Sequence, residues 1–130
     1  MSPLAWRSGA AAAALFLLAG CGSDDRPELT GAAEEGRAMF QQLNCAACHP
    51  GVGPELDGAW GTSIALDDGS TVIFDAAWVE ESVRDPDARV RAGDWRRMPA
   101  FDERQLDADS LAAIVAYLEA VGTDGSDTTP

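Results

Sequence analysis

The stretch NCAACHP, residues 44–50, limits what this chain can be more than any other part of its sequence. Two residues separate Cys45 from Cys48, and His49 follows directly. The whole chain of 130 residues contains 3 cysteines and 1 histidine. Most of its capacity for thiol and imidazole chemistry is therefore gathered within five positions.

C-x-x-C-H is the attachment signature of c-type haem. Two thiols at this spacing can each form a thioether with one porphyrin, and the adjacent imidazole can then reach the iron. Two alternatives remain. A structural zinc site needs four ligands, whereas the motif offers two cysteines and one histidine. A redox-active dithiol is typical of a βαβ context, which the surrounding sequence does not show. The motif favours one covalently attached haem c.

The first 20 residues resemble an export signal. Arg7 precedes the apolar run AAAALFLLAG, residues 11–20, which is shorter than the roughly 20 apolar residues that span a bilayer. The run ends in LAGC, which resembles the bacterial lipoprotein signal and makes Cys21 the predicted lipid attachment site. An ordinary cleaved signal peptide or a short uncleaved anchor is the alternative. We expect a protein that is exported and lipid-anchored to a membrane facing the periplasm or outer surface.

The formal net charge is −13, from 22 acidic and 9 basic residues. Removal of residues 1–20 would take away Arg7 and no acidic residue, so the mature chain is more acidic still. Such a charge speaks against nucleic acid as a partner and against direct adsorption to anionic lipid.

The hydrophobic pattern predicts a small, mainly helical domain. A helix is expected over residues 32–44, a short β-hairpin with its turn at residues 67–70, and a helix from Asp75 that ends before Pro86. A long loop follows over residues 86–105, and a last helix is capped by Asp107 and stopped by Gly122. We therefore divide the chain into a signal peptide (1–20), a tether (21–31), a haem domain (32–122) and a flexible tail (123–130).

Four segments of the sequence together resemble a class I cytochrome c, the small all-α fold around one covalent haem, here with a short β-hairpin insertion. They are GRAMFQQLNCAACHPGVGPELDGAWG, WVEESVRDP, MPAF and LAAIVAYLEAVG. The pattern is most similar to the cytochrome c domain fused to subunit II of some haem–copper oxidases, and to related lipoprotein cytochromes.

The resemblance assigns roles to individual residues. It makes Cys45 and Cys48 the thioether attachment points, His49 the proximal ligand, and Pro54 the residue whose carbonyl accepts the imidazole N–H. It also places Gly36 and Phe40 where the first helix crosses the last, facing two residues of that last helix, Ile114 and Tyr117.

The sixth iron ligand must be a methionine, because His49 is the only histidine and lysine is absent. Met1 would be cleaved away, and Met39 has the spacing of a packing residue in the first helix. Met98 precedes Pro99, which disfavours helix at the preceding position and so displays the thioether from a loop. We predict His49 and Met98 as the metal ligands, with a core methionine as the alternative reading of Met98.

One position departs from the resemblance. Many cytochromes c have an arginine near a haem propionate where this chain has Thr62. We expect another residue to take that role, with these candidates: Trp60, Trp78, Trp95, Arg96 and Arg97.

The resemblance implies an electron carrier rather than an enzyme. The first hypothesis is a membrane-tethered cytochrome c that receives electrons from a quinol-oxidising complex and delivers them to a terminal oxidase. The second is the electron-port subunit of a periplasmic dehydrogenase or reductase complex, or of a quinol-oxidising complex. The third, a ligand-sensing or catalytic haem protein, would need an open iron site, against which Met98 argues.

Overall fold

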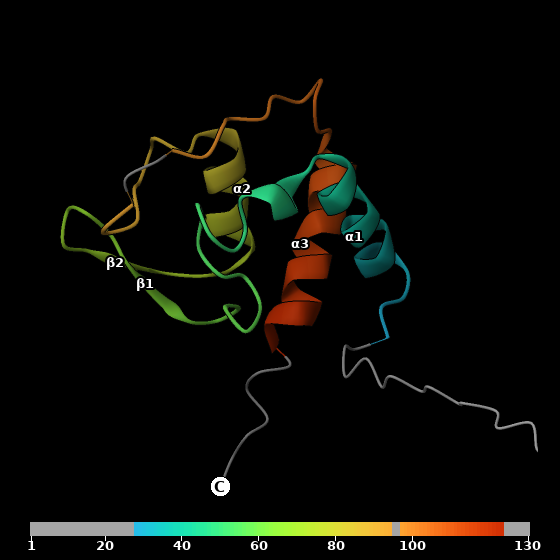
Figure 1. The fold of residues 1–130 in the computed structure, drawn as a ribbon, viewed down its shortest axis with the longest axis horizontal. Coiled ribbons are helices and arrows are strands. Elements are labelled where there is room, and N and C mark those ends of the chain that lie inside the picture. The colour runs from blue at the N-terminus through green and yellow to red at the C-terminus, as the bar shows by residue number, and fades with distance from the viewer. Residues whose placement is uncertain (1–27, 95–96, 124–130) are drawn as a thin grey trace, which may run out of the picture.

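The computed structural model describes residues 28–94 and 97–123, and α3 lies at the centre of this part of the chain (Figure 1). Helix α1 packs along one side of α3, while α2 and a two-stranded sheet lie on the other side. The elements in chain order are α1 (Ala32–Gln42), the 3-10 turn η1 (Cys45–Ala47), β1 (Ser63–Ala65), β2 (Thr71–Ile73), α2 (Ala76–Arg84) and α3 (Ala108–Thr123).

The predicted export and lipid-attachment features lie outside the described residues. These are the signal peptide (1–20), Cys21, the tether up to residue 27, and the tail from residue 124. Within residues 28–94 and 97–123, no helix is both long and apolar enough to cross a membrane.

The crossing of α1 and α3 follows from one small residue. A Cβ atom added to Gly36 would lie 1.8 Å from the carbonyl oxygen of Ala113, so only glycine allows the two backbones to approach this closely. Next to this contact, the rings of Phe40 and Tyr117 pack with their centroids 5.4 Å apart. The predicted crossing of the first and last helices is confirmed.

Helix α1 ends two residues earlier than predicted. Asn44 has φ 61° and ψ 30°, a left-handed conformation that cannot continue the helix, and its N–H donates to the carbonyl of Gln41. Asparagine adopts this conformation more readily than most residues. The chain therefore turns sharply here and enters η1, which carries the two cysteines.

Gly122 does not stop the last helix, as the sequence suggested, but lies within α3. It is buried, and a Cβ atom there would lie 2.5 Å from the Cβ of Trp60. Its small size thus permits the loop around Trp60 to pack on α3. The helix extends to Thr123, one residue beyond the predicted domain end.

The predicted β-hairpin is present. Strands β1 and β2 pair antiparallel with Ile64 opposite Val72. In the turn, the Asp68 carboxylate accepts hydrogen bonds from the N–H and the hydroxyl of Ser70, at 2.8 and 2.6 Å. These bonds to the charged form lower the pKa of Asp68.

Helix α2 begins where the sequence predicted. The Asp75 carboxylate caps it by accepting a hydrogen bond of 3.0 Å from the N–H of Trp78. Near its other end, Arg84 donates to the carbonyls of Phe101 and Leu106, at 3.0 and 2.7 Å. The long loop between α2 and α3 is therefore fastened to the end of α2.

Candidate functional site

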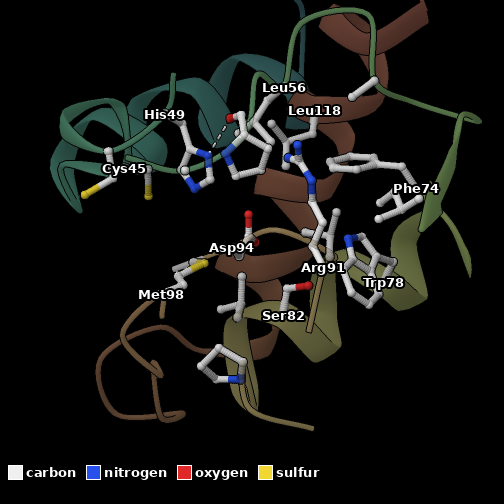
Figure 2. Close-up of a pocket in the computed structure, with 18 of the residues that line it drawn as sticks. Cys45, His49, Leu56, Phe74, Trp78, Ser82, Arg91, Asp94, Met98 and Leu118 are labelled. Carbon is white, nitrogen blue, oxygen red and sulfur yellow. Dashed lines mark hydrogen bonds between the residues drawn. The ribbon is translucent and has the colours of Figure 1, made fainter. Parts of the chain in front are cut away.

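A cavity of about 580 Å³ opens on the side of α3 away from α1, and it collects the predicted site residues. Figure 2 shows side chains reaching it from the η1 segment, the hairpin, α2, α3 and the loop after α2. Cys45, Cys48, His49, Pro54 and Met98 all line it. Residues far apart in sequence thus meet around one space.

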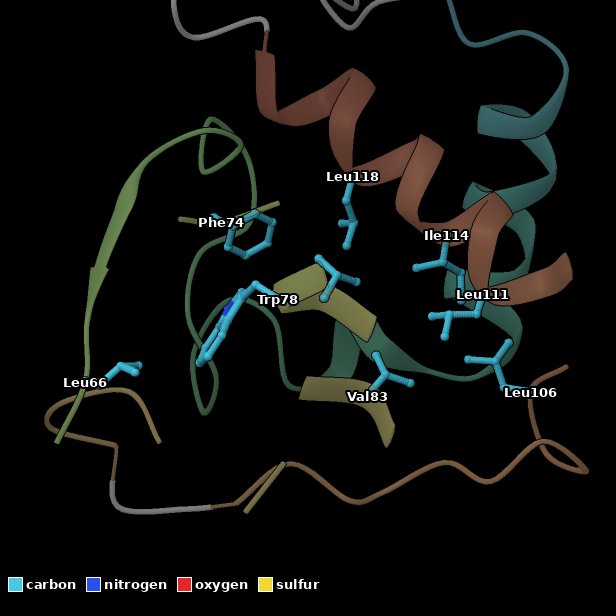
Figure 3. Close-up of a cluster of buried hydrophobic side chains, with 9 residues drawn as sticks. Leu66, Phe74, Trp78, Val83, Leu106, Leu111, Ile114 and Leu118 are labelled. Atoms are coloured by element: carbon cyan, nitrogen blue, oxygen red, sulfur yellow. The ribbon is translucent and has the colours of Figure 1, made fainter. Parts of the chain in front are cut away.

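Figure 3 shows the cluster of buried hydrophobic side chains, and most of its residues also line this cavity. None of its large side chains among the described residues falls below 2% exposure. The core residues that also line the cavity are Phe74, Trp78, Val79, Val83, Leu106, Ile114 and Leu118. The apolar interior of the domain therefore surrounds a space large enough for a cofactor.

The two cysteines are placed by η1. The N–H groups of Cys48 and His49 both donate to the carbonyl of Cys45, at 3.1 Å each, which closes the turn. Both thiols are free. Burial raises the pKa of the Cys45 thiol, whereas a redox-active dithiol depends on a lowered one. This raised pKa gives no support to the dithiol alternative.

The His49 ring has a defined tautomer. Its Nδ1 lies 2.9 Å from the carbonyl oxygen of Pro54. A carbonyl oxygen can only accept, so Nδ1 carries the proton and Nε2 of the neutral ring keeps its lone pair. The second nitrogen is therefore the one available as a metal ligand, and the hydrogen bond fixes the ring orientation.

Gly53 supports the same ring, and sequence reasoning missed it. A Cβ atom at this position would lie 2.6 Å from Cε1 and 2.8 Å from Nδ1 of His49. The N–H of Gly53 also donates to the carbonyl of Cys48 at 2.8 Å, which closes the loop after the motif. The available signal was the glycine directly before Pro54.

Met98 reaches the cavity from the loop between α2 and α3 (Figure 2). Hydrogen bonds attach this loop on both sides of Met98. Before Met98, the N–H of Ala92 donates to the carbonyl of Ala65 in β1 at 2.9 Å; after it, the N–H of Phe101 donates to the carbonyl of Val83 in α2 at 2.9 Å. Met39 and Met98 both pack against the hydrophobic core, but of the two only Met98 lines the cavity. Met98 is therefore the methionine that could reach a cofactor in this cavity, and its role as a ligand stays a prediction.

The cavity also receives a cation that sequence reasoning did not single out, Arg91. Among the residues that the sequence offered as partners of a haem propionate, Trp95 and Arg96 lie outside the described residues. Trp60 packs against Phe74 instead, with ring centroids 6.1 Å apart. Arg97 lines the cavity and forms an ion pair with Asp87 at 3.0 Å.

Trp78, another of those candidates, is 8% exposed and belongs to the hydrophobic core. It lines the cavity with its ring, and the Arg89 guanidinium lies 5.4 Å from the ring centroid. Its position fits a wall of the cavity.

These residues fit a covalently attached haem. The cavity offers two thiols, an imidazole with a free Nε2, and a thioether, set among apolar side chains. By contrast, no group of three or more His, Cys, Asp or Glu side chains that could hold a metal ion occurs in residues 28–94 and 97–123. The zinc alternative therefore lacks a ligand set in this part of the chain.

The family comparison agrees with this arrangement. Residues 31–118 match the model of the family described as cytochrome C oxidase, cbb3-type, subunit III. The chain belongs to this family. It is a c-type cytochrome domain, whose cofactor is haem c and whose role is electron transfer linked to an oxidase rather than catalysis. A search of curated proteins gave no match.

Membership in this cytochrome family accounts for the fold as well. The three α-helices and the two-stranded sheet of the described residues are consistent with a small class I cytochrome c. The matched oxidase subunit is subunit III of the cbb3 type, so the finer likeness to the domain fused to subunit II stays a prediction.

Proposed function

We propose that this chain is a membrane-tethered monohaem cytochrome c that carries single electrons in a respiratory chain to a terminal cytochrome c oxidase. One observation carries the proposal: His49 and Met98 line the same cavity as the two free thiols of Cys45 and Cys48. The thiols of Cys45 and Cys48 would hold the haem through two thioethers, and His49 and Met98 would ligate its iron. Bound haem supplies a one-electron iron couple.

The protein's own contribution is to hold these ligands still. Pro54 fixes the His49 ring through Nδ1 and makes its other nitrogen more basic. Backbone hydrogen bonds on both sides of Met98 hold the loop that carries its thioether to the cavity. A histidine–methionine pair raises the reduction potential and suits electron transfer. With both His49 and Met98 as ligands, the iron would offer no open site to a substrate.

The tether follows from the sequence of the first 31 residues. Cleavage before Cys21 and its modification with several acyl chains would anchor the protein stably, since one chain alone binds a membrane only marginally. The segment up to residue 31 would then hold the domain near the membrane, facing the periplasm or the outer surface. This raises its effective concentration at a quinol-oxidising complex and at the oxidase.

Purification of the mature protein from membranes tests the proposal. Intact mass should show one haem and the acyl chains. The reduced protein should then be oxidised by membranes that contain a terminal oxidase, and a Cys45→Ser/Cys48→Ser variant should transfer no electrons. A mass without porphyrin, or a haem protein that such membranes leave reduced, would contradict the proposed function.

A second candidate is the electron-port subunit of a larger complex, and it is favoured by the matched family, whose description names an oxidase subunit. Solubilised membranes separate the two. A free carrier should elute alone, whereas a port subunit should co-purify with its complex in a fixed ratio. Ready binding of carbon monoxide by the reduced protein would instead favour the ligand-sensing class.

A further inference from the structure

Arg91 lies opposite Leu66 in an isolated antiparallel bridge beside the hairpin. Hydrogen bonds of 2.9 Å flank this pair on both sides, from the N–H of Asp67 to the carbonyl of Val90 and from the N–H of Ala92 to the carbonyl of Ala65. Directly opposed residues of an antiparallel pair project from the same face. Leu66 is 3% exposed, so that face is the interior.

The Arg91 side chain accordingly extends into the cavity, as Figure 2 shows. It is partly buried there. The backbone bonds on either side leave the segment little freedom to turn this side chain outward. Its position is therefore a consequence of strand pairing and not of a flexible loop.

The Arg91 side chain differs from those of the neighbouring arginines, because it has no hydrogen-bond or ion-pair partner among the described residues. Arg84 donates to two backbone carbonyls, Arg89 pairs with Glu81 at 2.6 Å, and Arg97 pairs with an aspartate. A guanidinium cannot lose its proton, and a partly buried charge without a counter-charge is costly. An anionic group bound in the cavity would therefore be stabilised by the charge of Arg91.

Other charged groups also line the cavity. Glu55 accepts hydrogen bonds from the N–H groups of Leu56 and Asp57, at 3.0 and 3.3 Å. Asp94, which follows Arg91 in the same loop, lines the cavity and is exposed. Neither carboxylate forms an ion pair with Arg91. The anion that fits must therefore come with the cavity's occupant.

We propose that Arg91 binds a propionate carboxylate of the haem. This inference rests on the proposed function above, which supplies the haem. Thr62, which also lines the cavity, cannot supply this charge. A cation held near the haem disfavours its oxidised, more positive state. Arg91 is thus a positioning residue that orients the haem and raises its midpoint potential.

The test is the midpoint potential of the attached-haem protein as a function of pH. Arg91→Gln should lower the midpoint at pH 7 by the equivalent of about a tenfold change in the reduced-to-oxidised ratio, which is 59 mV for one electron. The inflection caused by propionate ionisation should move to higher pH, because glutamine stabilises the carboxylate less. Arg91→Lys should restore most of both effects.

Arg104→Gln is the matched control, because Arg104 is 91% exposed in its side chain and does not line the cavity. It should leave midpoint and inflection unchanged. If mass spectrometry shows attached haem in Arg91→Gln and the pH dependence of its midpoint potential is unaltered, this inference alone is overturned. If the wild-type protein carries no haem, the proposed function is overturned instead. An equal shift of the inflection in Asp94→Asn or Glu55→Gln would also overturn the inference, because it would show that Arg91 interacts with a carboxylate of the protein.

Discussion

The two sides of α3 are packed in different ways. Towards α1 the backbones nearly touch, since a single Cβ at Gly36 would overlap the carbonyl of Ala113. On the other side, the η1 segment, the hairpin, α2 and the following loop enclose about 580 Å³. The helix pair is therefore closely packed at its crossing, whereas we expect the cavity side to need its cofactor to complete the core. Small domains commonly need such a staple.

The largest effect should follow from removal of both attachment points. In Cys45→Ser/Cys48→Ser we expect complete loss of covalent haem and loss of fixed structure on the cavity side, because its core would lack a centre. Hydrogen exchange should show the amides of the hairpin and of residues 86–107 unprotected, and those of α1 and α3 less affected. Native-like protection of the hairpin in this variant would remove the contrast between the two sides.

The helix crossing should respond strongly to a single methyl group. Gly36→Ala should destabilise the haem protein by about 3 kcal/mol, because overpacking against backbone forces α1 and α3 apart. Gln41→Ala, at an exposed position on the same helix, should stay within about 0.5 kcal/mol. Chemical denaturation of both variants gives the comparison; equal stabilities would show that the crossing is not tightly packed.

A methyl group on the cavity side should act on the ligand rather than on the fold. Gly53→Ala should displace the His49 ring. The free energy of unfolding should fall by about 1–2 kcal/mol, because the hydrogen bond from His49 to the Pro54 carbonyl is weakened. The substitution should also change the visible spectrum, while Asp57→Ala, an exposed neighbour, should change neither. A Gly53→Ala spectrum identical to wild type would mean that the ring has room to spare.

The smallest effect should come from the start of α2. Asp75→Ala should cost about 1 kcal/mol by removing the cap on the Trp78 N–H, and Asp75→Asn should retain most of the stability. Because α2 forms a wall of the cavity, the loss should be measured in the haem protein by denaturation. Equal losses in both variants would show that the charge, and not the cap, matters.

Local patterns predicted the helices, the hairpin and the Asp75 cap, because each depends on neighbours in sequence. The same reasoning was wrong about Gly122, which it read as a stop signal. A glycine is needed there because Trp60 packs on it, and this contact between distant residues cannot be predicted from the neighbouring sequence. The end of α1 was also misplaced, since the left-handed turn at Asn44 serves the entry into η1.

The site was predictable to the extent that it is written as a motif. Cys45, Cys48, His49 and Pro54 lie within ten residues of each other, and Met98 followed from the scarcity of other ligands. Gly53 and Arg91 were missed for a different reason. Their relevance depends on the distance to a ring and on which face of a strand pair a side chain projects from, and both are set by the fold.

The central claim is that His49 and Met98 would both ligate the haem iron, and the visible spectrum of two methionine variants tests it most directly. Met98→Ala should abolish the sulfur-to-iron absorption near the red end and lower the midpoint potential, while Met39→Ala should preserve both. A Met98→Ala protein that keeps the wild-type absorption and midpoint would contradict the account.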